Sequence, residues 1–216
     1  MLTRLISQFD MVISKYQHLS TTVHRALYLS LRLTILASLN ETIKPSYVLE
    51  NSLSDPDPSL QALTAKLTSY DTEVFSYIPT LQHTHITTGL STLTDTYLLR
   101  LITKRVKDMN PNGCAHLQLN MLVLQQNLKN IEPATSLTFS AMFLDLYTAG
   151  PDAIVRWAKE SGRSFKVPGG SFGEAEVRTL LELAYGDKLK DERREVGVQA
   201  KRLLDGHLLD ISEAFY

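Results

Sequence analysis

The sequence predicts an all-α protein built from helices that pack side by side. Apolar residues recur every three or four positions along most of the 216 residues, which is the spacing of an amphipathic helix. No segment alternates polar and apolar residues as a half-buried strand does, and no repeat occurs at a solenoid period. The links between the apolar stretches are short, so we expect roughly seven to eight helices, with neighbours antiparallel in stacked bundles.

The first half of the chain divides at its prolines. Residues 2–16 and 19–43 show helical spacing, and the second of these is apolar around most of its girth, which predicts a helix buried in a bundle. The proline-containing stretch 44–59 interrupts the pattern. A further helix is expected from Pro58 to Ile78, where Pro79 ends it.

The pattern resumes in residues 80–109 and continues after a break. We expect one helix over 80–109, a turn at "NPNG" (110–113) and the next helix over 114–131. A shorter helix is expected over 137–148, and Pro151 suits the first position of the helix after it.

The last quarter of the chain contains a glycine-rich break. Residues 162–170 predict a flexible loop, and Ser171 with Glu174 forms a capping-box pattern that would open a helix ending at Gly186. The final helix is expected over about 188–214, with a mixed-charge face. We treat residues 1–216 as one helical-bundle region, with a subdivision into 1–131 and 136–216 as an option.

Composition excludes several classes of partner. The formal net charge is −1, so no overall basic field attracts nucleic acid. Cys114 is the single cysteine, which excludes an internal disulfide and fits a reducing compartment. No cleavable leader pattern is evident, and the longest apolar stretch, 26–39, contains Arg32 and is too short to span a bilayer. We therefore expect a soluble protein whose membrane association is peripheral.

The sequence offers no pattern that predicts catalysis. His83 and His85 are two positions apart, so on a helix they point away from each other and make a poor metal pair. Cys114 lies on an apolar helix face, where an inert thiol is expected. "PGG" (168–170) lacks the residues of a phosphate-binding loop. We predict no catalytic residue, no cofactor and no metal.

One helix face within 114–131 has an apolar residue at steps of three and four. Such spacing produces a continuous line of side chains along one side of a helix, suited to packing against another helix. We expect Leu122 to broaden this line on one side. We call it the packing seam, and it consists of Leu117, Met121, Leu124, Leu128 and Ile131.

Three amides follow one another beside the packing seam, at Gln125, Gln126 and Asn127. Amides form directional hydrogen bonds without the desolvation cost of a charge, and they have no useful pKa. They are therefore either a polar flank of ordinary packing or contact residues that fix a neighbouring helix. A neighbour in the same bundle and a helix of another protein both stay open.

A basic cluster ends the preceding helical stretch, at Lys104, Arg105 and Lys107. Cations at the end of a helix complement its macrodipole, which is one interpretation. The other is a contact with acidic protein or with lipid headgroups.

Five segments, in order along the chain, carry a resemblance to one family. The segment "NMLVLQQNLKNI" (120–131) resembles a segment near the C-terminus of the sec-eight subunit of the exocyst (exocyst component four), in its fungal-like form. The other four segments are similar to that family in the same order: "HRALYLSLRLTILASL" (24–39), "DPDPSLQALTAKL" (55–67), "LTFSAMFLDLYTAGPDAIV" (137–155) and "ERREVGVQAKRLLDGHLLDISE" (192–213). No segment is a catalytic signature.

The resemblance implies a function as well as a fold. It implies a rod-like, CATCHR-like subunit of stacked helical bundles that tethers secretory vesicles to the plasma membrane, without catalytic residues. It further implies other exocyst subunits as partners, with small GTPases or membrane-fusion proteins as indirect ones, and a cytoplasmic, peripheral location at sites of polarised secretion. Because a full subunit is several times longer, we expect this chain to be a C-terminal fragment. Two alternatives remain: a helical module that binds anionic membranes, and a small all-α enzyme.

Overall fold

The computed structural model describes residues 2–161, 173–190 and 195–215, and these are almost entirely helical, which confirms the all-α class. Two turns of π- and 3₁₀-helix, Tyr70–Val74 and Phe75–Tyr77, continue the second helix. The elements are α1 (Leu2–Thr42), β1 (Ser46–Tyr47), α2 (Pro58–Ser69), α3 (Thr80–Thr87), α4 (Leu90–Arg105), β2 (Asp108–Met109), α5 (Pro111–Ile131), α6 (Thr138–Ala149), α7 (Pro151–Ser161), α8 (Glu174–Leu189) and α9 (Glu195–Phe215).

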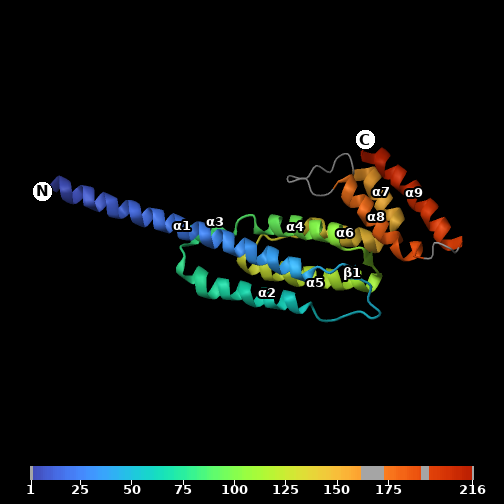
Figure 1. The fold of residues 1–216 in the computed structure, drawn as a ribbon, viewed down its shortest axis with the longest axis horizontal. Coiled ribbons are helices and arrows are strands. Elements are labelled where there is room, and N and C mark those ends of the chain that lie inside the picture. The colour runs from blue at the N-terminus through green and yellow to red at the C-terminus, as the bar shows by residue number, and fades with distance from the viewer. Residues whose placement is uncertain (1, 162–172, 191–194, 216) are drawn as a thin grey trace.

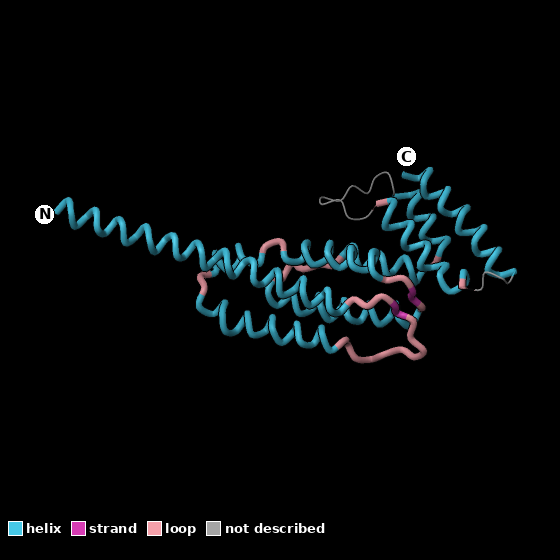
Figure 2. Tube along the Cα trace, in the orientation of Figure 1, coloured by secondary structure: helices cyan, strands magenta, loops and turns pink. Residues whose placement is uncertain are grey.

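The helices form an elongated bundle with a second group of helices at one end (Figures 1 and 2). Helices α1, α2, α4, α5 and α6 lie alongside one another, while α7, α8 and α9 pack together at the end far from the N-terminus. Helix α6 contacts α4 and α5 of the first group and α7 and α8 of the second group. Because α6 contacts both groups of helices, the helix contacts do not divide the chain between 131 and 136. The subdivision into 1–131 and 136–216 stays a prediction.

One continuous core runs through both groups. Helical spacing brings Leu31, Ile35 and Leu39 of α1 onto one face, and they are buried against α2 and α4. In the second group, Leu180 of α8 and Ile211 of α9 are fully buried. Burial of these apolar side chains is the main favourable term in folding.

The expectation that residues 19–43 form a buried helix is wrong for much of that stretch, which is exposed up to Ser30 at most positions. Residues 2–16 and 19–43 are one helix of 41 residues, about 60 Å long at 1.5 Å per residue. Helix α2, with 12 residues, covers only a short part of it. Val23, Leu29 and Leu33 are exposed, and the N-terminal part of α1 projects beyond the bundle (Figure 1).

The expected helix over 80–109 is divided into two by Gly89. This glycine has a φ of 79°, a left-handed conformation that only glycine adopts without strain, and α4 starts at the next residue. The Glu132 side chain accepts hydrogen bonds from the N–H groups of Gly89 (3.1 Å) and Ser91 (2.8 Å). A carboxylate at the end of α5 thus caps the start of α4.

The "NPNG" motif begins a helix and is not a separate turn. The Asn110 side chain accepts a hydrogen bond from the Gly113 N–H (2.8 Å), and Pro111 is the first residue of α5. Just before it, Ser46 and Tyr47 of β1 pair in parallel with Asp108 and Met109 of β2. Two-residue strands are too short to show alternation, so the sequence did not predict them.

The C-terminal boundaries differ from expectation at two places. Gly186 does not stop its helix, since α8 continues to Leu189. Helix α8 begins at Glu174, and the Glu176 carboxylate accepts a hydrogen bond from the Gly173 N–H (2.9 Å). The expected loop 162–170 and the expected cap Ser171 lie outside the described residues.

Candidate functional site

The packing seam of α5 faces the inside of the bundle. Leu117, Leu124, Leu128 and Ile131 are buried, and Met121 is partly buried against the same core. Helix α5 packs between α2 and α6. Leu122, expected to broaden the seam, is instead 67% exposed, because no described helix covers that side of α5.

Leu128→Ala tests how much the packing seam contributes to stability. The Leu128 side chain is fully buried, so its truncation should lower the free energy of unfolding by about 2–5 kcal/mol through lost burial and a residual cavity. Thermal and denaturant unfolding would measure the change. Leu122→Ala is the control on the same helix, and equal effects of the two substitutions would contradict the assignment of the seam.

Two of the three amides have partners within the bundle. The Gln125 Oε1 accepts a hydrogen bond from the Leu137 N–H (3.2 Å), and the Asn127 Nδ2 donates to Thr64 Oγ1 of α2 (2.5 Å). Gln126 is exposed, one helical turn from the exposed Leu122. Gln125 and Asn127 therefore order neighbouring segments of the bundle, whereas Gln126 faces solvent.

The basic cluster is divided between a structural and an exposed part. Arg105 donates hydrogen bonds to the Asn40 carbonyl (2.7 Å) and to Asn40 Oδ1 (2.6 Å), at the last turn of α1. Lys104 and Lys107 are exposed. The positive charge of Arg105 thus complements the negative end of the macrodipole of α1 and that of its own helix, α4.

A buried polar network joins the start of α2 to α5. Asp57 accepts hydrogen bonds from Lys44 Nζ (2.6 Å) and Asn120 Nδ2 (2.7 Å), and His116 Nε2 lies 3.3 Å from Asp57 Oδ2. The Asp57 N–H in turn donates to Asn120 Oδ1 (2.9 Å). Burial raises the pKa of Asp57, but the hydrogen bonds from Lys44 and Asn120 and the charges of Lys44 and His116 outweigh it, and the pKa is lowered overall.

This lowered pKa makes stability depend on pH at the acid end. The folded state favours the Asp57 carboxylate, so the stabilisation is present above the pKa that Asp57 has in the unfolded chain. It is lost as the pH falls through the folded pKa, which lies below the ordinary value of 3.8. We expect the unfolding midpoint to fall steeply below about pH 4. Asp57→Asn should flatten that decline in melts at pH 2–7, whereas an unchanged acid decline would contradict the role of Asp57.

The pairing of His116 with Asp57 resembles a catalytic dyad, but nothing can reach it. Both side chains are buried. A hollow lined by Asn120, Thr42 and apolar side chains that include Leu39, Leu60 and Leu144 has a volume of about 20 Å³, room for about one water. The network therefore orders the loop before α2 and has no access to a substrate.

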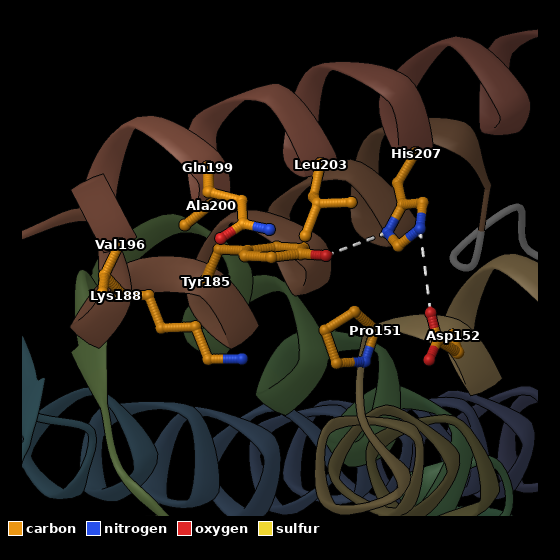
Figure 3. Close-up of a pocket in the computed structure, with 9 residues that line it drawn as sticks. All are labelled: Pro151, Asp152, Tyr185, Lys188, Val196, Gln199, Ala200, Leu203 and His207. Atoms are coloured by element: carbon orange, nitrogen blue, oxygen red, sulfur yellow. Dashed lines mark hydrogen bonds and ion pairs between the residues drawn. The ribbon is translucent and has the colours of Figure 1, made fainter.

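A larger hollow of about 390 Å³ opens between α7, α8 and α9 (Figure 3). The Tyr185 hydroxyl points toward His207 Nδ1 (3.2 Å), and His207 Nε2 lies 3.8 Å from Asp152 (Figure 3). The Lys188 amino group lies over the Tyr185 ring, 5.8 Å from its centroid (Figure 3). Burial, and then the charge of Asp152, raise the pKa of Tyr185, so its hydroxyl stays protonated and is a poor nucleophile.

Other candidates for chemistry are inert in the described part of the chain. The Cys114 thiol is buried, 3.6 Å from the Leu144 carbonyl, and burial raises its pKa. The ring of His85 stacks on His24 (centroids 5.0 Å apart), while His83 meets Phe75 edge-on. Within residues 2–161, 173–190 and 195–215, no three metal-ligating side chains gather, and no helix has the length and apolar content needed to cross a bilayer.

The N-terminal part of α1 presents an apolar surface that the sequence did not predict to be exposed. Phe9 and Tyr16 are 67% and 69% exposed, and the intervening Val12 is about half exposed. The helical spacing of these residues was evident in the sequence, but their spacing does not reveal whether a neighbouring helix covers them. Contiguous exposed apolar side chains mark sites of association.

Helices that pack side by side around a shared apolar core place the chain in the class of all-α helical-bundle proteins. Within that class, the chain is similar to a probable exocyst complex component sec8 of Neurospora crassa, with 29% identity over an alignment of 244 positions that covers 96% of this chain. The resemblance found in the five segments is thereby confirmed over nearly the whole sequence. No family model matches the chain.

The chain spans about a fifth (22%) of the length of the curated relative that it matches. The similarity therefore concerns one helical region of a much longer protein.

Proposed function

We propose that this chain is a non-catalytic helical region of an exocyst subunit, which helps to tether secretory vesicles to the plasma membrane. The observation that carries the proposal is the similarity to the exocyst component over 96% of the chain. The all-helical fold supports it, since a tether acts by holding distances and presenting docking faces rather than by chemistry.

Rigidity is the property that such a role requires, and the helix ends supply it. Helix α3 ends where Arg32 of α1 donates hydrogen bonds to the carbonyls of Ile86 (2.7 Å) and Thr88 (2.8 Å). Helix α4 starts at the groups bound by Glu132. Helix ends normally have unsatisfied backbone groups and fray, so caps from neighbouring helices hold the bundle together.

Docking would use exposed apolar side chains as anchors, because a few such residues usually carry most of the binding energy. On α5, Leu122 and Gln126 lie one turn apart on the solvent side. We propose this face as a contact with a helix of another exocyst subunit. Small GTPases and membrane-fusion proteins would then act through the assembled complex, at the cytoplasmic side of the plasma membrane.

The test is recovery of the other exocyst subunits with a tagged chain that carries Leu122→Glu. We expect the substitution to reduce recovery at least about tenfold, as burying a charge at an anchor does. Leu209→Glu on α9 is the matched control, since Leu209 is 68% exposed against 67% for Leu122. No recovery of any exocyst subunit, even with a chain extended to the length of the relative, would refute the proposed function.

Direct binding to anionic membranes is less well supported. Arg105 is engaged with Asn40, and Asp108 next to the exposed Lys107 binds Lys190 (3.2 Å), which leaves a small basic surface. Cosedimentation with vesicles that contain phosphatidylserine, at low and high salt, distinguishes this alternative. Salt-sensitive binding that depends on Lys104 and Lys107 would favour it.

A further inference from the structure

A groove runs along the surface between α5 and α6. It forms a hollow of about 540 Å³, and one side of α6 supplies most of its lining. The residues of this lining that bear on its chemistry are Gln125, Thr138, Ala141, Met142, Asp145 and Leu146. On α6 they recur at three and four positions, so they share one side of the helix. From Thr138 to Ala149 the helix extends about 17 Å, which is the length of three helical turns.

Two hydrogen bonds fix α5 along the other side of the groove. Gln118 Nε2 donates to Asp145 Oδ1 (3.0 Å), and the Leu137 N–H donates to Gln125 Oε1 (3.2 Å). Leu122 lies four positions after Gln118 and three before Gln125, so it is on the same side of α5, between the two bonds. The exposed side chain of Leu122 therefore borders the groove.

The groove has a negative and a positive end. Of the described residues that line the hollow, Asp145 is the charged one, and it is exposed. A carboxylate accepts several hydrogen bonds, so the bond from Gln118 leaves room for a cation. Lys129 is exposed one turn beyond Gln125 on the same side of α5, eleven residues after Gln118. The positive charge therefore lies about 17 Å along the groove from Asp145.

We propose that this groove receives a helix of another exocyst subunit. Apolar side chains of that helix pack onto Leu122, Met142 and Leu146. The helix carries a basic residue that faces Asp145 and, about eleven positions away, an acidic residue that faces Lys129. This inference rests on the proposed function, to which it adds the surface and the chemistry of the partner.

The shape and the charges of the groove both favour a helix as the occupant. A depression that follows two antiparallel helices for three turns accepts the ridge of side chains of a third helix. Positions eleven residues apart lie on the same side of a helix, so one partner helix meets both charges at once. Opposite charges at the two ends also fix its direction, because a reversed helix would place like charges together.

Charge reversal in the groove tests the proposal. The tagged 216-residue chain is expressed with each of the other exocyst subunits in turn. Asp145→Lys should reduce recovery of one subunit at least about tenfold, and Asp145→Asn should reduce it less, because asparagine removes the attraction without adding repulsion. Asp205→Lys, at an exposed carboxylate on α9, is the matched control and should leave recovery unchanged. Both positions are exposed, so all three variants should keep the wild-type melting midpoint.

A photo-cross-linking amino acid at Ala141 identifies the partner segment. It should couple to a helix of the same subunit that carries a basic residue, whereas the cross-linker at the exposed Glu182 of α8 should not. Reversing the charge of that basic residue to Asp should restore binding to Asp145→Lys.

Two kinds of failure are distinguishable. Equal recovery with Asp145→Lys and Asp205→Lys, or a cross-link from Ala141 back to this same chain, would overturn the groove contact. The proposed function would then still stand, because exocyst subunits are recovered. Recovery of no exocyst subunit with the wild-type chain would overturn the groove contact and count against the proposed function as well.

Discussion

Gly113→Ala is expected to lower the free energy of unfolding by about 3 kcal/mol, the upper range for forcing an extra methyl group into a packed site. A Cβ at this position would lie 1.7 Å from the Tyr47 carbonyl oxygen, and backbone rather than a movable side chain is what it meets. Either β1 must leave β2 or the first turn of α5 must shift. The backbone of Gly113 does not have a left-handed φ, so conformational freedom is not the reason for a glycine here. Gly113 is required because the backbones of β1 and α5 approach each other too closely for a side chain.

Denaturant unfolding of Gly113→Ala measures this cost, and Gly186→Ala provides the control. A Cβ at Gly186 meets no atom within 4 Å, and the residue lies inside α8. Alanine there should stabilise the protein by about 0.5–1 kcal/mol through helix propensity. If Gly113→Ala unfolds at the wild-type midpoint, the contact between β1 and α5 contributes nothing to the fold.

Asp95→Ala is expected to destabilise the protein by about 3–5 kcal/mol, because it leaves several buried donors without an acceptor. Asp95 lies on α4 and is 2% exposed. Its carboxylate accepts hydrogen bonds from the Phe139 N–H (2.8 Å), the Ser140 N–H (2.9 Å) and the Ser140 hydroxyl (2.6 Å). These groups form the first turn of α6, whose own cap position is Leu137, a residue that cannot accept a hydrogen bond through its side chain.

Thermal melts and amide hydrogen exchange of α6 would register the loss of this cap. Ser140→Ala removes one of the three hydrogen bonds and should cost about 1 kcal/mol. Asp205→Ala, an exposed carboxylate on α9, should change stability by less than about 0.5 kcal/mol. Equal effects of Asp95→Ala and Asp205→Ala would show that the negative charge of Asp95 does not hold α6.

Periodicity predicted the helices well, because it depends on neighbours three and four positions away. The packing seam from Leu117 to Ile131 is an example: spacing alone assigned its inner face, and the buried side chains lie on that face. Leu122 was assigned to the same side incorrectly, since its exposure depends on which helices happen to be near. The same reason explains why α1 was expected to be buried along residues 19–43.

Residues that act over long distances in the sequence could not be found in this way. Asp95 and Glu132 cap helices that begin more than one element away, and nothing beside them in the sequence indicates it. Gly89 could have been found, because a glycine in a helical pattern is a common boundary. The role of Gly113 could not have been found from the sequence, because it depends on the position of Tyr47 in a different segment.

The link between the loop after α1 and the start of α5 also affects how the chain folds as it is made. Leu49 and Asp57 bind Asn110 and Asn120, residues 61 and 63 positions later. Contacts of such high sequence separation form slowly, because a long loop must close first. On the ribosome, the apolar face of α1 at Leu31 and Ile35 stays uncovered until α2 and α4 have emerged to pack against it, and this interval is the period in which a chaperone would be needed.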